Sequence, residues 1–463
     1  MPYESAFISA SASTSPWTSR MRQQYAPNVS EVDRSAAPER LRDYHRRAAA
    51  TAVRLKFGAP SIERTWPADT GSADPASTAI WLDVEHANLV AVALGSSSEV
   101  PGHLVAMSGI LAPYLDACGH YVEATALHTA AASVALTTGE AGAALNRLGA
   151  VHARSGDLAG AIDRYGEAFE TCEQAGDTAG AATALHGIAV ARFRTGRYRE
   201  AVATATDALA RYREVGNQIG AGEALKSLGL SHLQLGDYPK AIEHLQQALV
   251  LHRATGDRAN EGRSLNNLGF LHYRLGHDEE ALRYFEDSRA IAHKLGNRAG
   301  EAVVLINIAH LDTRHGRVEE ALAGYGEAVA LCAEIGYRVG QVEALRGLGV
   351  ACRRLGRLAG AFKHLNQALV LNRALRDPDM EAGALNDLGE TLRAADRQSD
   401  ALHQHTAAHS IAIASGDPYA QARATSGLAV VLDAAGQSAA AREHRERADA
   451  LYHKIGVPPR ARD

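Results

Sequence analysis

The sequence has few of the residues on which disulfide cross-links, metal centres and membrane insertion depend. It contains four cysteines in 463 residues, and these form neither a CxxC pair nor a disulfide framework; they are Cys118, Cys172, Cys332 and Cys352. Scattered thiols are typical of a reducing compartment, so we expect the protein to be cytoplasmic. No run of about 18 apolar residues occurs, which argues against a membrane-spanning helix.

The motifs of the common enzyme classes are also missing. The chain has no nucleophile elbow, no HExxH motif and no glycine-rich phosphate loop, and even the dipeptide Gly-Lys is absent. The formal net charge is -5 and the acidic and basic residues are well mixed, which argues against direct binding to nucleic acid. We therefore expect a non-catalytic protein without a cofactor, which binds neither nucleic acid nor membrane directly.

The dominant feature of the chain is a period of 40 residues. A Leu-Gly pair or its equivalent recurs without a single-residue slip, beginning at Leu148, Ile188, Leu228, Leu268, Ile308, Leu348, Leu388 and Leu428. An alanine recurs with the same period at Ala161, Ala201, Ala241, Ala281, Ala321, Ala361, Ala401 and Ala441. A fixed period of this size indicates a stacked array of repeats.

Each repeat reads as a hairpin of two helices. In the copy at residues 261–296, apolar and small residues follow helical spacing in both halves. Gly276 separates the halves, since glycine adopts the left-handed conformation that ends a helix without a side-chain clash. Two helices of roughly 15 to 18 residues and two short turns account for the period.

This pattern resembles the tetratricopeptide repeat (TPR). The positions that carry the resemblance are Leu265, Leu268, Gly269, His272, Gly276, Ala281, Phe285 and Ser288. His272 replaces a usual tyrosine, Ser288 replaces a usual alanine, and the unit is about six residues longer than the commonest form. The resemblance implies an all-α solenoid of about eight regular repeats, wound into a right-handed superhelix.

Four segments are expected along the chain. Residues 1–36 are rich in serine and alanine, and we expect them to be disordered. Residues 37–100 hold two amphipathic or apolar helices and form an N-terminal helical cap. A divergent TPR-like hairpin follows at 101–139, and the eight-repeat array occupies 140–463. Its last helix has a polar outer face, as a terminal repeat requires; the face consists of Arg442, Glu443, Arg445 and Glu446.

A second resemblance lies in the N-terminal helical cap. Residues 79–91, together with the arginine-rich helix at 39–57, resemble the start of the C-terminal TPR sensor in actinobacterial antibiotic-regulatory proteins of the NB-ARC type. That family usually has arginine at the position of His86. The resemblance implies a role in transcriptional regulation through protein contact. The nucleotide-binding loop of the family, Gly-x-x-x-x-Gly-Lys-Ser/Thr, does not occur in this sequence.

Two columns of polar residues follow the repeat period on the first helix of each hairpin. In a TPR array these helices line the concave surface, where arginine forks bind carboxylates. The resemblance therefore points to an acidic peptide or protein segment held in the groove, although a solvated column without a binding role is the alternative. The candidate groove residues are Arg154, Arg194, Lys226, Asn266, Arg274, Arg314, Arg346 and Arg354, with Phe193, Phe270 and Tyr273 beside them.

One pair of histidines has the spacing of a metal site. His405 and His409 lie one helical turn apart and are able to share an ion. His405, however, takes the position that Phe285 and Tyr325 hold in other copies. We interpret His405 as a core imidazole and assign no metal ligand from the sequence.

Three functions fit these observations. The first is a TPR sensor or adaptor that binds a peptide or protein segment and takes part in transcriptional regulation. The second is a free-standing scaffold for a multiprotein complex. The third is a peptide-pheromone receptor of the TPR response-regulator phosphatase type, although the helices at 39–57 and 77–94 offer no obvious catalytic glutamine.

Overall fold

The computed structural model describes residues 31–57, 75–375 and 377–458. The chain divides into two compact units, Met1–Val151 and His152–Asp463. Within the described ranges every regular element is a helix, which confirms the predicted all-α class. None of these helices is long and apolar enough to cross a membrane.

The first unit contains four helices and most of a fifth. They are α3 (Glu31–Phe57), α4 (Pro75–Gly95), α5 (Pro101–Cys118), α6 (Tyr121–Val134) and α7 (Thr138–Ser155). Helices α3 to α6 share one apolar core, in which Leu82, Leu104 and Leu111 are fully buried. Helix α3 begins at Glu31, before the expected start of the helical cap at residue 37. Residues 1–30, which the sequence predicts to be disordered, lie outside the described residues.

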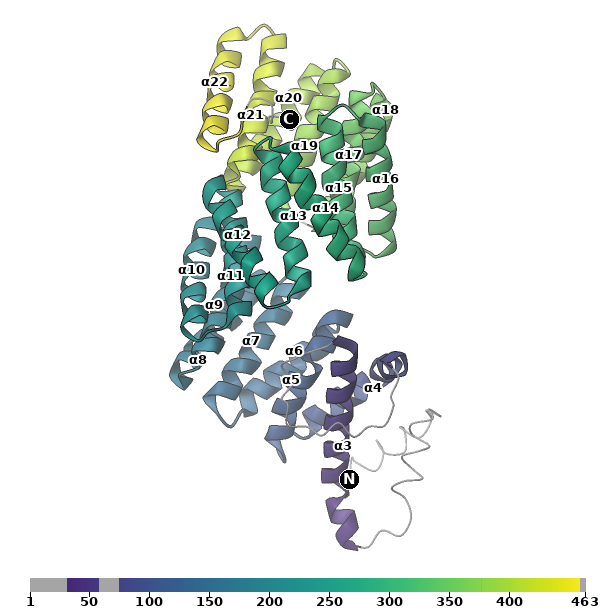
Figure 1. Cartoon of the computed structure of the whole chain (residues 1–463), viewed down its shortest axis with the longest axis vertical. Helices are drawn as coiled ribbons and strands as arrows, with labels where there is room; N and C mark the ends of the chain where they lie inside the picture. The colour runs from purple at the N-terminus through teal and green to yellow at the C-terminus, as the bar shows by residue number, and fades with distance from the viewer. Residues whose placement is uncertain (1–30, 58–74, 376, 459–463) are drawn as a thin grey trace. The chain divides into compact units, whose positions relative to one another are not determined.

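The second unit is a regular array of hairpins (Figure 1). Its first helices begin 40 residues apart, from α9 to α21, and so do its second helices, from α10 to α22, which confirms the predicted period. The helices are α8 (Leu158–Ala175), α9 (Thr178–Arg194), α10 (Tyr198–Glu214), α11 (Gln218–Gln234), α12 (Tyr238–Ala254), α13 (Arg258–Arg274), α14 (Asp278–Lys294), α15 (Arg298–Arg314), α16 (Val318–Glu334), α17 (Arg338–Arg354), α18 (Leu358–Leu375), α19 (Pro378–Ala394), α20 (Gln398–Ser415), α21 (Pro418–Ala434) and α22 (Ser438–Lys454).

The turns between helices are set by residues with special backbone preferences. Gly276 has φ 72°, as predicted for a glycine that ends a helix, and the other turn glycines of the array do the same. Asp396 replaces such a glycine and still adopts φ 60°, so the fold imposes the turn even on a residue with a Cβ atom. Most first helices start at a side chain that accepts a backbone N–H bond; these N-caps include Asp177, Asn217, Asp257, Asn297, Asp377 and Asp417.

Close approach of the two helices in a hairpin depends on the Leu-Gly pair. A Cβ added at Gly269 would lie 2.7 Å from the ring of Phe285 on α14, and one at Gly349 would lie 2.5 Å from Leu365 on α18. The glycine therefore leaves the space that a large side chain of the next helix fills. This arrangement confirms the packing predicted for Gly269.

The array also closes on itself. One apolar cluster joins α12 and α13 in the middle of the array to α21 and α22 at its end, through Tyr238, Leu271, Tyr419, Tyr452 and Ile455 (Figure 1). Tyr198 donates a hydrogen bond to Asp379, 2.7 Å away and 181 residues later in the chain. These contacts join repeats that are far apart in the sequence, so the concave surface faces other repeats of the same array.

Substitution of two helical glycines should separate packing from helix propensity. Gly269→Ala forces a Cβ against Phe285, and we expect it to lower the free energy of unfolding by about 1–3 kcal/mol. Gly326→Ala on α16 places its Cβ in open space, so we expect a gain of up to about 1 kcal/mol from the higher helix propensity of alanine. Chemical unfolding followed by circular dichroism measures both, and equal effects of the two variants would contradict the packing described above.

Candidate functional site

The concave side of the second unit encloses a cavity of about 1440 Å³. Its floor is built from the first helices of successive hairpins, as the sequence predicts. The residue directly after each Leu-Gly pair or its equivalent contributes a half-buried side chain to this floor, and three of this column are apolar; the column consists of Leu230, Phe270, His310, Val350 and Glu390. Of this column only Phe270 was singled out from the sequence.

Most of the predicted groove residues line this one cavity. They are Phe193, Arg194, Phe270, Tyr273, Arg274, Arg314, Arg346 and Arg354. The other three candidates, Arg154, Lys226 and Asn266, are not among the lining residues. The cavity thus brings together side chains that are separated by up to 161 residues in sequence, from Phe193 to Arg354.

Three arginines of the first predicted column, which stands five residues after each Leu-Gly pair or its equivalent, make hydrogen bonds between repeats. Arg314 donates to the carbonyl oxygen of Tyr273 at 2.7 Å, and Arg354 donates to that of Thr313 at 2.8 Å. Arg194 donates in the same way to Ala153. Each acceptor lies 41 residues earlier, near the end of the preceding first helix, where carbonyl groups have no intrahelical partner. These three arginines therefore tie their repeats to the preceding ones.

Arg314 does not have the solvated side chain expected from the sequence. The side chain is only 9% exposed, its guanidinium lies 3.6 Å from the centre of the Tyr273 ring, and it forms an ion pair with Asp278 at 2.9 Å. Its head group is thus already engaged in contacts within the array. The physical reason is that Tyr273 and Asp278 of the preceding repeat surround this side chain, a contact that a single repeat in the sequence does not reveal.

Arg274 belongs to the same column but makes different contacts. Its guanidinium lies 3.5 Å from the centre of the Tyr419 ring and 5.0 Å from that of Phe270, so it reaches across the cavity to α21. Gln234, one repeat earlier, faces Asp379 at 3.4 Å. Both contacts join residues 145 positions apart, so equivalent positions of two successive repeats contact equivalent positions of two later ones.

The second predicted column stands two residues before the first residue of each Leu-Gly pair or its equivalent, and includes His186, Lys226 and Asn266. It also connects repeats. His186 shares a hydrogen bond of 3.0 Å with Ser227, and Asn307 donates to Asn266 at 2.8 Å. Lys226 lies 2.7 Å from Glu223 and donates to Asn260 at 3.0 Å. Lys226 and Asn266 therefore take part in contacts within the array instead of lining the cavity.

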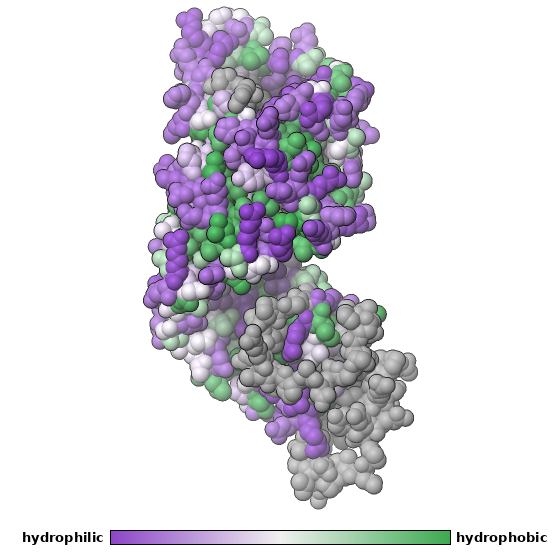
Figure 2. Space-filling model, viewed as in Figure 1, coloured by the Kyte–Doolittle hydropathy of each residue, from purple (hydrophilic) through white to green (hydrophobic). Residues whose placement is uncertain are grey.

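The cavity lining is more mixed in charge than the basic, amide-bearing columns predicted from the sequence. Among the described residues its lining includes eight arginines and seven carboxylates. Asp387, for example, is paired with Arg346 and with Arg423, each at 2.9 Å. Burial acts to raise the pKa of Asp387, but the two guanidinium groups outweigh it and hold this pKa below its usual range. Figure 2 shows hydrophobic patches between hydrophilic side chains on the visible face of the array.

A model of the tetratricopeptide repeat matches residues 140–214, 221–294 and 300–374. The chain contains tetratricopeptide repeats. Together with the fold, this match confirms the first resemblance stated from the sequence. No curated protein sequence matches the chain, and the resemblance to actinobacterial antibiotic regulators remains a hypothesis.

Three solved structures share the fold. A Rap protein complexed with competence and sporulation factor has a TM-score of 0.59 and 13% sequence identity, over 80% of this chain and 98% of that one. The apo form of the quorum sensor NprR from B. thuringiensis has a TM-score of 0.50 and 14% identity, over 80% and 99%. A Rap conjugation gene regulator in complex with a peptide has a TM-score of 0.50 and 14% identity, over 70% and 82%.

The far wall of the cavity was missed by sequence reasoning. It includes Asp379, Asp417, Tyr419 and Tyr452 from the last repeats of the TPR array. One oxygen of Asp379 accepts the Tyr198 hydrogen bond, and its other oxygen, Oδ1, is buried and has no hydrogen-bond partner in the structure. The repeat pattern alone carries no sign of these contacts, because they depend on the pitch of the superhelix.

His405 is a core residue, as interpreted from the sequence. Its side chain is 1% exposed, and its Nδ1 lies 3.2 Å from Oδ1 of Asn386. Burial lowers its pKa to about 4. The ring packs over Gly389 and Gly427, as Phe285 packs over Gly269.

Loss of Asp387 should strongly destabilise the TPR array. Asp387→Asn leaves Arg346 and Arg423 as buried charges without their shared carboxylate, and we expect a cost of about 3–5 kcal/mol. The matched control is Asp400→Asn, since Asp400 forms an exposed pair with Arg397 and its loss should cost less than about 1 kcal/mol. Denaturant unfolding of both variants measures the difference, and a similar cost for the two would show that the buried triad is not a stabilising unit.

His405 should make the stability of the protein depend on pH. Its folded pKa is lower than the value of about 6.5 in the unfolded chain, so the stability it contributes is present above pH 6.5 and is lost as the pH falls toward 4. Between pH 7.5 and 5.0 this loss amounts to about 2 kcal/mol.

His405→Phe should remove that part of the pH dependence, because phenylalanine occupies the equivalent site at Phe285. The control is His403→Gln, an exposed position on the same helix. Unfolding free energies at the two pH values test this, and an unchanged difference in the His405 variant would rule out the assignment.

Proposed function

We propose that the TPR array is a non-catalytic regulatory module that binds a peptide segment in its concave cavity. The observation that carries this proposal is the cavity itself, which joins an apolar floor to polar walls. Its volume of about 1440 Å³ exceeds the roughly 300–1,000 Å³ of pockets for small molecules. A chain segment of several residues is a ligand of matching size.

The lining favours a segment with apolar side chains and charges of both signs. Leu230, Phe270 and Val350 offer apolar contact along the floor. Three of the lining carboxylates, Glu343, Asp387 and Glu390, pair with lining arginines. A uniformly acidic segment would meet seven carboxylates as well as eight arginines. We therefore replace the acidic ligand expected from the sequence by a mixed one.

The shared fold agrees with this function. Two of the similar solved structures are complexes, one with competence and sporulation factor and one with a peptide. For the wider role, the resemblance at residues 79–91 supports control of transcription in an actinobacterium, through protein contact in the cytoplasm. A scaffold for a multiprotein complex is the main alternative, and a receptor of the response-regulator phosphatase type shares the same peptide-binding step.

Selection from a synthetic peptide library tests the proposal. The full chain is immobilised and exposed to a degenerate library, and an enriched peptide is labelled for fluorescence anisotropy. We expect at least one sequence to bind with saturable affinity. Enrichment no better than on the bare support would contradict peptide binding and favour the scaffold.

Two valines of one repeat then locate the binding surface. Val350→Asp places a charge on the apolar floor, and we expect it to weaken peptide binding at least about tenfold, because a desolvated carboxylate costs more than 1.4 kcal/mol. The control is Val370→Asp on the second helix of the same hairpin, where the side chain is 62% exposed and lies outside the cavity. Equal binding by the two variants would place the recognition surface elsewhere.

A further inference from the structure

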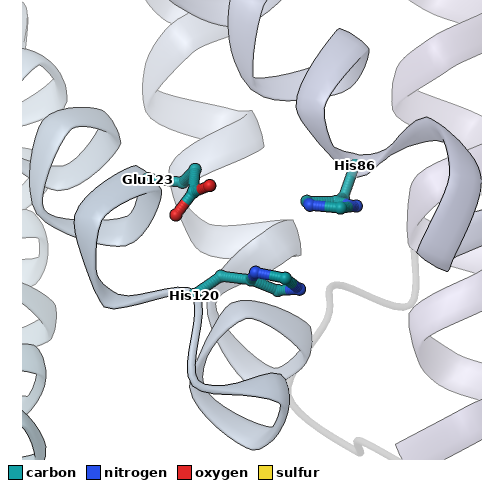
Figure 3. A group of neighbouring side chains, drawn as sticks. All are labelled: His86, His120 and Glu123. Carbon is teal, nitrogen blue, oxygen red and sulfur yellow. The ribbon is translucent and has the colours of Figure 1, made fainter.

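Three side chains that commonly bind metal ions meet in the first unit. His86 lies on α4, His120 is the residue before α6, and Glu123 is in the first turn of α6. One potential ligand atom from each lies within 4.8 Å of the others. Figure 3 shows the carboxylate of Glu123 beside the two imidazole rings. In the part of the chain that the structure describes, no other three His, Cys, Asp or Glu side chains meet so closely.

The local fold explains why the three converge. His120 and Glu123 are three residues apart at the start of a helix, so their side chains project from the same side. Helix α4 then packs against α5 and α6 in the shared core, which brings His86 onto that side. His86 and His120 are 34 positions apart in sequence, so no motif of short spacing revealed the group.

The tautomer of His86 suits metal binding. Its Nδ1 lies 3.0 Å from the backbone oxygen of Asp83, so Nδ1 carries the proton and donates it to that carbonyl. The other ring nitrogen, Nε2, then has a free lone pair. A hydrogen bond from one imidazole nitrogen to a carbonyl is the usual support of a metal-bound histidine, since it orients the ring and raises its basicity.

A second layer of contacts holds the group in place. Tyr114 lies beside both rings, with centroid distances of 5.8 Å to His86 and 5.7 Å to His120. Its hydroxyl donates to the carboxylate of Asp83 at 2.9 Å, and Asp83 is the residue whose backbone orients His86. The two histidines are thus positioned by side chains that are not themselves ligands.

We propose that His86, His120 and Glu123 bind one divalent metal ion of the zinc type and thereby join α4 to the α5–α6 hairpin. Two imidazole nitrogens and one carboxylate are a ligand set that zinc accepts in a tetrahedral site, with the fourth position left for water or another ligand. All three residues are half-buried, so an ion has access from solvent. This proposal revises the expectation of no metal that the sequence supported.

Binding requires only a local change in the rings. The imidazoles of His86 and His120 are stacked, with centroids 4.2 Å apart and an angle of 25° between the planes. A tetrahedral ion with bonds of about 2.1 Å holds its donors roughly 3.4 Å apart. Rotation of the rings about χ2, a torsion with a broad energy profile, changes the spacing and direction of the donors.

Zinc titration of the full chain tests the proposal. The protein is treated with a chelator, desalted, and titrated with zinc chloride in a calorimeter at pH 7.5. We expect one equivalent to bind to the parent, and we expect His86→Ala and Glu123→Gln each to weaken this step at least about tenfold. Cobalt chloride serves as a second probe, because tetrahedral Co²⁺ gives intense visible absorption that should be lost in both variants.

The matched control is His293→Ala. His293 lies 2.9 Å from Glu301 and is 85% exposed, so it is a histidine–carboxylate pair without a third ligand, and its loss should leave the titration unchanged. Far-ultraviolet circular dichroism checks that each variant keeps its helices, and the conservative Glu123→Gln retains the size of the side chain. A parent that binds no zinc, or variants that bind as tightly as the parent, would overturn the site.

Discussion

The array depends on the distance between the two helices of each hairpin. A glycine in the first helix and a large side chain in the second, such as Gly269 and Phe285, fit together only because the glycine lacks a Cβ atom. This fit sets the distance between the two helices in the hairpins that carry the glycine, and that distance contributes to the pitch of the superhelix. The cavity, the hydrogen bonds of the arginine column and the contact of Arg274 with Tyr419 all depend on that pitch.

Features that repeat every 40 residues could be predicted from the sequence, because each copy gives an independent reading of the same local physics. The left-handed Gly276, the contact of Gly269 and the core position of His405 were all predicted from such comparison between copies. The concave surface was placed on the first helices because the TPR resemblance implies it, and most of the residues predicted for the groove do line the cavity.

Features that depend on long-range geometry could not be predicted in this way. Arg274 faces Tyr419 and Tyr198 faces Asp379, and no local pattern marks these pairs. The predicted environment of Arg314 was wrong for a related reason: Tyr273 and Asp278 of the preceding repeat surround its side chain, and a column of arginines in a sequence looks the same whether it is solvated or buried. The His86–His120–Glu123 group was missed because its members come from helices outside the regular period.

The closure of the array has a consequence for how such a chain can change its length. An open solenoid gains or loses a repeat at little cost, since each unit contacts only its neighbours. Here Gln234 and Arg274 each contact a residue 145 positions later in the chain. A 40-residue repeat inserted or deleted between the two partners of these contacts would pair each of them with the wrong repeat. Duplication of an internal repeat would therefore require new contacts between the distant repeats, whereas addition of a repeat at either end of the array would not. The number of repeats between the contacting ones is thus fixed by these contacts, as the number of strands is fixed in a closed barrel.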